Sequence, residues 1–220
     1  MDREEAMRRV VFIGPSLHEG DRVPEEIERR PPAARGDVLA AAAAGARIIG
    51  LVDGVFATKL AVSNGEVREA ARCGARLFGA ASIGALRAVE CPDAMEGVGS
   101  VHRMFATGEL TDDDEVACLV DAETHAALSL PLVRIRAGLQ TASDESVELA
   151  RRQPSLVARM KELPFDERSL RRLEVEAERL GIRPADVVRL LRAVRAPESD
   201  VKRADALELL RLCATAAAKR

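Results

Sequence analysis

Short apolar runs separated by helix-like stretches fill the first half of the chain. Three apolar runs have the length of buried strands, and they cover residues 10–13, 47–54 and 76–82. Helical patterns accompany them, over residues 37–44, 64–73 and 82–90. Strands that alternate with helices are typical of parallel sheets joined by right-handed helical crossovers. The pattern therefore predicts an α/β fold with a mostly parallel sheet.

An internal repeat supports this prediction. The pattern Gly-Ala-Arg-apolar-apolar-Gly begins at Gly45 and again at Gly74, 29 residues later, which is the length of one helix plus one strand. The same offset superposes Asp53 on Ser82, and Ser16 also follows a predicted strand. Ligands of parallel sheets bind outside the carboxyl ends of the strands. We therefore expect these three polar residues to meet at one sheet edge, although each alone could be a turn or cap residue.

From residue 126 onward the pattern is helical, with a high content of Arg, Glu and Leu. Periodicity broken by prolines predicts helices near residues 130–142, 145–161, 166–180, 184–194 and 200–218. The predicted division is an α/β domain over residues 1–125, which carries Ser82, followed by an all-helical region over 126–220. That region could form a homo-oligomer, dock a partner or simply cover the core.

Two further segments are less regular. The segment 17–34 is polar and broken by prolines, so we predict a loop with at most a short helix there. The pattern of residues 115–120 predicts another strand, which directly follows the acidic run 112–114. Three consecutive acids could bind a cation, but they lack the spacing of an EF-hand loop and more often cap or solvate an element. We expect no metal site there.

Composition argues against several classes of function. Lys and Arg total 33 against 36 Asp and Glu, for a formal charge of -3, and aromatic residues make up only 2%. The chain therefore lacks the overall positive charge and the aromatic platforms that nucleic-acid binding uses. No segment resembles a signal peptide or a membrane span, and the four cysteines lack metal-site spacing. We expect a cytoplasmic protein with no cofactor, metal, nucleic-acid or membrane partner.

Ser82 lies where a predicted strand passes into a helix. Such a turn presents a hydroxyl beside free helix N–H groups, which can stabilise an oxyanion. The window 80–84 matches the G-x-S-x-G nucleophile elbow, except that alanine replaces the first glycine. Serine needs a base, and Lys59, in the loop after the second predicted strand, can serve if burial or a nearby cation lowers its pKa. A helix-capping Ser82 and a solvated Lys59 are the alternatives.

Two arginines are candidates for holding an anionic substrate. Arg35 and Arg87 could bind a carboxylate or thiocarboxylate through forked hydrogen bonds. Arg87 could equally brace Glu90 on its own predicted helix. We interpret Asp37 first as a helix cap and second as a partner that orients Arg35.

Several motifs in order resemble the TfuA family. They are "GPSL" at 14–17, "RPPAARGD" at 30–37, "GLVDGVF" at 50–56, "GAASIGALRAVE" at 79–90 and "GELTDDDEVA" at 108–117. The resemblance covers about residues 9–140. Independent motifs in a fixed order are more specific than any one of them alone.

The resemblance implies a partner of YcaO enzymes in ATP-dependent thioamidation of peptide backbones. Family members are understood to release sulfide by hydrolysing the C-terminal thiocarboxylate of a small ubiquitin-like sulfur carrier such as ThiS, with a Ser-Lys pair, and to help the YcaO enzyme engage its peptide. In methanogens and some bacteria that peptide is methyl-coenzyme M reductase. Elsewhere it is a ribosomally made natural product.

The family serine falls on Ser82, and other motif positions fall on Ser16, Arg35, Asp37 and Asp53. The family lysine falls on Gly65, so Lys59 is the tentative base unless the base is lost or rearranged. Two other classes stay open. One is a non-catalytic adaptor that binds the YcaO enzyme, with Ser82 only as a cap, and the other is a small-ligand-binding α/β domain.

Overall fold

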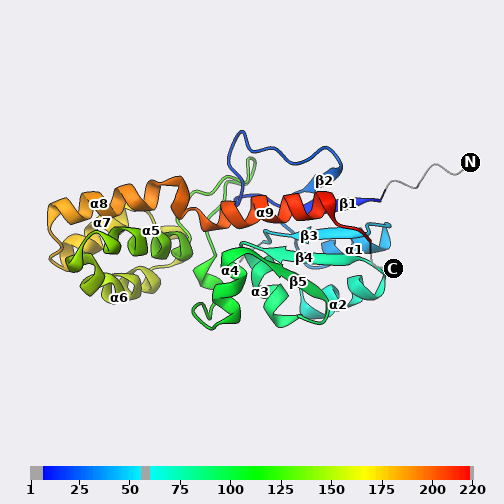
Figure 1. The fold of residues 1–220 in the computed structure, drawn as a ribbon, viewed down its shortest axis with the longest axis horizontal. Helices are drawn as coiled ribbons and strands as arrows, with labels where there is room; N and C mark the ends of the chain where they lie inside the picture. Colours follow the sequence, from blue (N-terminus) through cyan, green and yellow to red (C-terminus); the bar gives the residue numbers. More distant parts are fainter. Residues whose placement is uncertain (1–6, 56–59, 219–220) are drawn as a thin grey trace, which may run out of the picture. The chain divides into compact units, whose positions relative to one another are not determined.

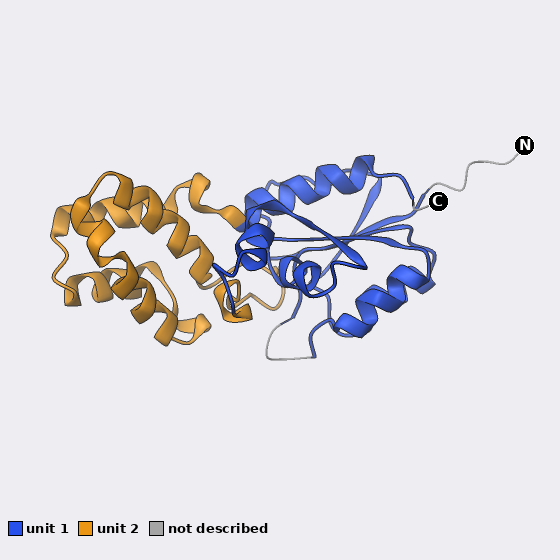
Figure 2. Cartoon of the chain, turned by 60° about the horizontal axis from the view of Figure 1, so that its bottom comes forward, with its two compact units in different colours: residues 1–111, 202–220 blue, residues 112–201 orange. Residues whose placement is uncertain are grey.

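The computed structural model of the chain describes residues 7–55 and 60–218. Two compact units make up the chain (Figure 2), residues 1–111 with 202–220 and residues 112–201. Two clusters of buried side chains form the core of the first unit, and a third cluster forms the core of the second.

A five-stranded parallel sheet forms the centre of the first unit and confirms the predicted α/β fold (Figure 1). Its strands are β1 (Arg9–Phe12), β2 (Ile27–Arg30), β3 (Ile48–Leu51), β4 (Arg76–Ala80) and β5 (Met95–Val98). Their order across the sheet is β2-β1-β3-β4-β5. Leu51 pairs with Phe12 on one side and with Gly79 on the other, so β1, β3 and β4 end at nearly the same level.

Helices cover both faces of this sheet. One face packs against α1 (Asp37–Ala43), α2 (Asn64–Arg72) and α3 (Ile83–Glu90). Successive residues of a strand point to opposite faces, so Val10 belongs to this face and Val11 to the other, which packs against α9 (Val201–Thr215). Figure 1 shows α9 on one side of the sheet and α2 and α3 on the other. Burial on both faces explains why the central strands read as continuous apolar runs.

The position of α9 differs from the sequence-based division. The prediction groups residues 200–218 with the helical region, whereas Leu209, Leu210 and Cys213 of α9 pack on the sheet. The boundary between the units lies at residue 111, not at 125. An amphipathic helix pattern shows that a helix needs an apolar neighbour but does not identify that neighbour, so this assignment depends on the tertiary structure.

The strands β2 and β5 are missing from the sequence-based prediction, and both lie at sheet edges. The sequence of β2 is IERR, with one buried residue, and that of β5 is MEGV, with exposed residues in the middle. An edge strand has one neighbour and partial solvent exposure, so it does not need a continuous apolar run. The prediction of a loop with at most a short helix over 17–34 is therefore wrong at Ile27–Arg30.

The second unit is helical, as predicted. Its elements are η1 (Asp113–Glu115), α5 (Leu132–Asp144), α6 (Val147–Glu162), η2 (Phe165–Glu167), α7 (Leu170–Arg179), α8 (Pro184–Arg195) and η3 (Pro197–Ser199). Leucines such as Leu132, Leu156 and Leu190 fill its core. In the described part of the chain, no helix is both long and apolar enough to cross a bilayer.

The strand predicted over 115–120 does not form. Glu115 ends the short helix η1 and is buried, where it accepts hydrogen bonds from Arg136 at 2.9 and 2.8 Å. Asp114 accepts one from the buried guanidinium of Arg168 at 2.5 Å. Asp114 and Glu115 thus form ion pairs with arginines of the same unit. No cluster of three or more potential metal-ligating His, Cys, Asp or Glu side chains occurs among residues 7–55 and 60–218.

The first turn of α3 lies directly against β3, backbone to backbone. The Gly84 N–H donates to the carbonyl of Val52 at 3.3 Å. A Cβ atom at position 84 would lie 1.8 Å from the Leu51 oxygen, and one at Gly79 would lie 2.2 Å from the Gly84 oxygen. Glycine is therefore required at positions 79 and 84 by the packing of the protein's own backbone.

Replacing Gly84 by alanine should destabilise the protein strongly. The new methyl group overlaps backbone rather than a movable side chain, so we expect a loss of about 3 kcal/mol or more in the free energy of unfolding. Denaturant titration measures this loss. Gly65→Ala is the matched control, because Gly65 is exposed in α2 and a Cβ atom there would meet only Ser63 Oγ, at 4.0 Å. The better helix propensity should stabilise the protein by up to about 1 kcal/mol. A Gly84→Ala protein as stable as the wild type would contradict the close contact between the first turn of α3 and the end of β3.

Polar side chains near the start of α9 anchor it within the first unit. Arg203 Nε and Nη2 donate to the two carboxylate oxygens of Asp21 at 2.8 and 2.5 Å. The buried Asp205 accepts the N–H groups of Ser100 and Val101, at 2.8 and 2.7 Å, at the start of α4 (Gly99–Ala106). The hydrogen bonds from Arg203 lower the pKa of Asp21 from 3.8 to about 2.

Acidification should remove the stabilisation that Asp21 provides. The pKa of Asp21 is about 2 in the folded protein instead of 3.8. The stabilisation is therefore complete at pH values above 3.8 and is lost as the pH falls through about 2. The free energies of unfolding of the wild type and of Asp21→Asn should differ most near neutral pH and converge as the pH approaches 2. Denaturant titrations at several pH values measure this. A difference that stays constant over that range would contradict the ion pair.

Candidate functional site

The strand order reverses between β1 and β3, and parallel sheets bind ligands at such a point. Ser16 follows β1, and Asp53 follows β3. Asp53 Oδ1 accepts a hydrogen bond from Ser16 Oγ at 2.7 Å, and Oδ2 accepts from the N–H groups of Gly14 and Ser16 at 2.9 and 3.0 Å. Both side chains are buried. The structure thus brings two of the predicted site residues together, in a network of internal hydrogen bonds.

Lys202 joins this network from α9, and sequence reasoning missed it. Its Nζ lies 3.9 Å from Asp53 Oδ1, and its side chain is only 4% exposed. A buried ammonium group needs such a partner, because an unpaired charge in the interior is strongly destabilising. The chain has few lysines, but the helical pattern around residue 202 does not distinguish a buried lysine from a solvated one.

Ser82 occupies the N-cap position of α3, directly after β4. The preceding residue, Ala81, has a φ of 63°, a left-handed conformation that is uncommon for a residue with a side chain. The Ser82 N–H donates to the Ala80 carbonyl at 2.7 Å, and its side chain makes no capping hydrogen bond to α3 within the described chain. Ser82 is 2% exposed. The interpretation of its hydroxyl as a helix cap is therefore wrong, and the turn that holds it is tight and strained.

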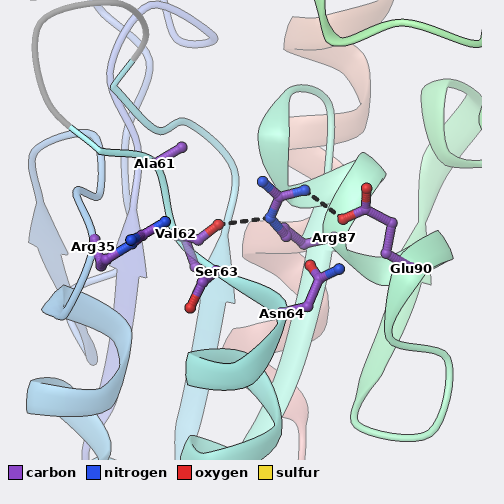
Figure 3. Close-up of a pocket in the computed structure, with 7 residues that line it drawn as sticks. All are labelled: Arg35, Ala61, Val62, Ser63, Asn64, Arg87 and Glu90. Atoms are coloured by element: carbon purple, nitrogen blue, oxygen red, sulfur yellow. Dashed lines mark hydrogen bonds and ion pairs between the residues drawn. The ribbon is translucent and has the colours of Figure 1, made fainter.

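A pocket of about 320 Å³ brings Arg35 and Arg87 together (Figure 3). It is lined by Arg35, Ala61, Val62, Ser63, Asn64, Arg87 and Glu90. Arg87 Nε donates to the Val62 carbonyl at 2.7 Å, and its Nη1 pairs with Glu90, so the predicted bracing of Glu90 occurs. The Arg35 guanidinium forms no hydrogen bond or ion pair with any residue that the structure describes. Ser82 does not line the pocket.

Asp37 does not cap α1, contrary to the sequence-based prediction. The N-cap residue is Gly36, with a φ of 96°, and Asp37 Oδ2 accepts the Ala34 N–H at 2.8 Å. The first N–H groups of α1 bind Glu66 instead, whose Oε1 accepts from Gly36 and Val38, both at 2.9 Å. A carboxylate on another helix takes the place of the local cap because the fold brings it within reach.

The predicted base cannot be placed, because Lys59 lies outside the described residues. Gly65, at the position of the family lysine, is exposed in the first turn of α2 and offers no side chain. That helix begins as predicted, with a capping box in which Ser63 Oγ accepts the Glu66 N–H at 3.2 Å. A Ser-Lys pair at Ser82 and Lys59 stays a prediction.

The fold and these residues define a parallel α/β domain with a buried polar network at its switch point and an arginine-lined pocket. A family model described as TfuA-like protein matches residues 53–169, which is more than half of the chain. The protein belongs to the TfuA-like family, as its motifs predict. The matched segment contains Asp53 and Ser82 but not Ser16 or Lys202. No curated protein matches the chain.

Breaking the Lys202–Asp53 pair should destabilise the first unit. Lys202→Met leaves the Asp53 carboxylate buried without its cation, so we expect a loss of about 3 kcal/mol or more. The double variant Lys202→Met with Asp53→Asn should recover part of that loss, because no buried charge remains unpaired. Arg72→Met is the control, since Arg72 pairs with Glu69 on the surface and its loss should cost about 0.5 kcal/mol or less. Equal effects of the Lys202 and Arg72 variants in denaturant titrations would contradict the buried pair.

Proposed function

We propose that this protein hydrolyses the C-terminal thiocarboxylate of a small ThiS-like sulfur carrier and thereby supplies sulfide to a YcaO enzyme that thioamidates a peptide backbone. The observation that carries the proposal is a serine at the strained start of a helix that its hydroxyl does not cap. Membership of the TfuA-like family supports the association with YcaO.

The proposed reaction is acyl transfer through Ser82. Its Oγ attacks the thiocarboxylate carbon, the C–S bond breaks, and sulfide leaves. The serine proton passes to a base, for which we propose the Lys59 amine. Water then hydrolyses the resulting ester and returns the carrier with an ordinary carboxylate. The positive end of α3 favours the negative charge that develops on the carbonyl oxygen.

The other predicted site residues have supporting roles in this proposal. Ser16 and Asp53 hold the loops after β1 and β3 in place, because their polar atoms are bonded within the protein. Arg35, Asp37 and Arg87 are proposed to meet the peptide tail of the carrier. The protein is also proposed to help the YcaO enzyme engage its substrate, either a natural-product peptide or methyl-coenzyme M reductase.

The burial of Ser82 favours a second candidate function, a non-catalytic adaptor of a YcaO enzyme. A nucleophile that is only 2% exposed must become accessible before it can meet a carrier tail. An adaptor has no such requirement, because it would bind the YcaO enzyme through its surface and leave sulfide release to another protein.

Sulfide release from a thiocarboxylated carrier tests the proposal. Ser82→Ala should lower the rate about 10³-fold or more, because the nucleophile is lost. Ser169→Ala is the matched control, since Ser169 caps α7 with a bond to the Arg172 N–H at 3.2 Å. This control should lose about 1 kcal/mol of stability and keep the sulfide rate.

Two results would contradict hydrolysis at Ser82. One is release by folded Ser82→Ala at the wild-type rate. The other is a folded wild-type protein that releases no sulfide but binds a YcaO enzyme, which would support the adaptor. Lys59→Gln tests the base separately, because loss of sulfide release with unchanged stability is expected only if the amine takes part.

A further inference from the structure

The pocket lined by Arg35, Asn64 and Arg87, here called the arginine pocket, is distinct from the Ser82 turn. Ser82 does not line it, and Arg87 lies five positions further along α3. Each residue of an α-helix advances about 1.5 Å, so the Cα atoms of these two residues are separated by roughly 7 Å along the helix axis. Ser82 therefore contributes no atom to the surface of this pocket.

The charges around the arginine pocket favour a monoanion. Its lining contains two guanidinium groups, those of Arg35 and Arg87, and one carboxylate, that of Glu90. Arg87 already uses Nε on Val62 and Nη1 on Glu90, whereas the N–H groups of Arg35 are unused among the described residues. A carboxylate balances the remaining positive charge and fits the guanidinium fork. A doubly charged phosphate would bring excess negative charge beside Glu90.

The side chain of Asn64 adds a hydrogen-bond acceptor to which no described residue donates. Its Oδ1 is buried and has no hydrogen-bond partner among the described residues. Figure 3 shows its amide group beside Arg87 and Glu90. Buried acceptors are almost always paired, so an unpaired one calls for a donor from elsewhere. A backbone N–H of a ligand would supply that donor.

We propose that the arginine pocket binds the carboxyl terminus of a peptide chain. The terminal carboxylate lies on Arg35 and Arg87, and the last amide N–H donates to Asn64 Oδ1. A pocket of about 320 Å³ is at the small end of ligand sites, which suits the last residues of a chain. The site goes beyond the proposed hydrolysis. It rests on that proposal only for one possible source of the ligand, a carrier tail after its sulfur has left.

Binding of a short peptide tests this inference without any catalysis. The probe is an N-acetylated tetrapeptide that ends in Gly-Gly with a free carboxylate, titrated by calorimetry into the full-length protein. The same peptide with a C-terminal amide should bind at least about tenfold more weakly, because hydrogen bonds to a charged group are lost. Free glycine and inorganic phosphate, as further probes, should bind more weakly than the carboxylate peptide.

Arg35→Gln is the decisive variant, because its side chain has no internal partner among the described residues whose loss would disturb the fold. It should weaken binding of the carboxylate peptide at least about tenfold and leave the amide peptide unaffected. Asn64→Leu should weaken binding about fivefold by removing the acceptor. Arg72→Gln, on the exposed surface of the same helix α2 as Asn64, should leave the affinity unchanged.

The outcomes separate this inference from the proposed hydrolysis. Equal affinities of the carboxylate and amide peptides, tighter binding of phosphate or glycine, or an unchanged affinity of Arg35→Gln would each overturn the peptide site. Ser82→Ala should bind the carboxylate peptide as the wild type does. Peptide binding by a protein that releases no sulfide would support the pocket and overturn only the hydrolysis.

Discussion

The buried carboxylate of Asp53 holds together the edge of the sheet on which the candidate site depends. It binds two N–H groups and one hydroxyl of the loop after β1, and it lies beside the ammonium group of Lys202 from α9. Three segments that are far apart in the sequence therefore meet at one side chain. A charge in the interior is tolerated only with such partners, so the positions of both loops and of α9 are coupled to one another.

A second constraint is steric and acts on the turn before α3. The helix begins so close to β3 that Gly84 has no space for a side chain, and Ala81 adopts a left-handed backbone. This packing explains Gly79 and Gly84 without any ligand. It also explains why Ser82 is nearly buried, although its hydroxyl does not cap the helix. Catalysis at this position would require the turn to open.

The polar groups of the first unit fall into two classes. The Asp53 network and Glu66 are buried, and their oxygens are bonded within the protein, which is typical of groups that maintain a fold. Arg35 and Asn64 border a pocket and carry polar groups without partners among the described residues. Unpaired polar groups beside a cavity are better candidates for ligand contacts, since a ligand can complete their hydrogen bonds.

Local pattern was enough to predict the α/β class, the central strands and most of the helices. Burial on both faces leaves continuous apolar runs, and the capping box of Ser63 and Glu66 marks the start of α2, whereas the predicted caps at Asp37 and Ser82 do not form. It also placed Ser16 and Asp53 at one edge and identified the family. The edge strands β2 and β5, the packing of α9 on the sheet and the role of Lys202 depended on the tertiary structure. These features arise from contacts between distant segments, and a periodic pattern describes only what a segment needs to bury, not which neighbour buries it.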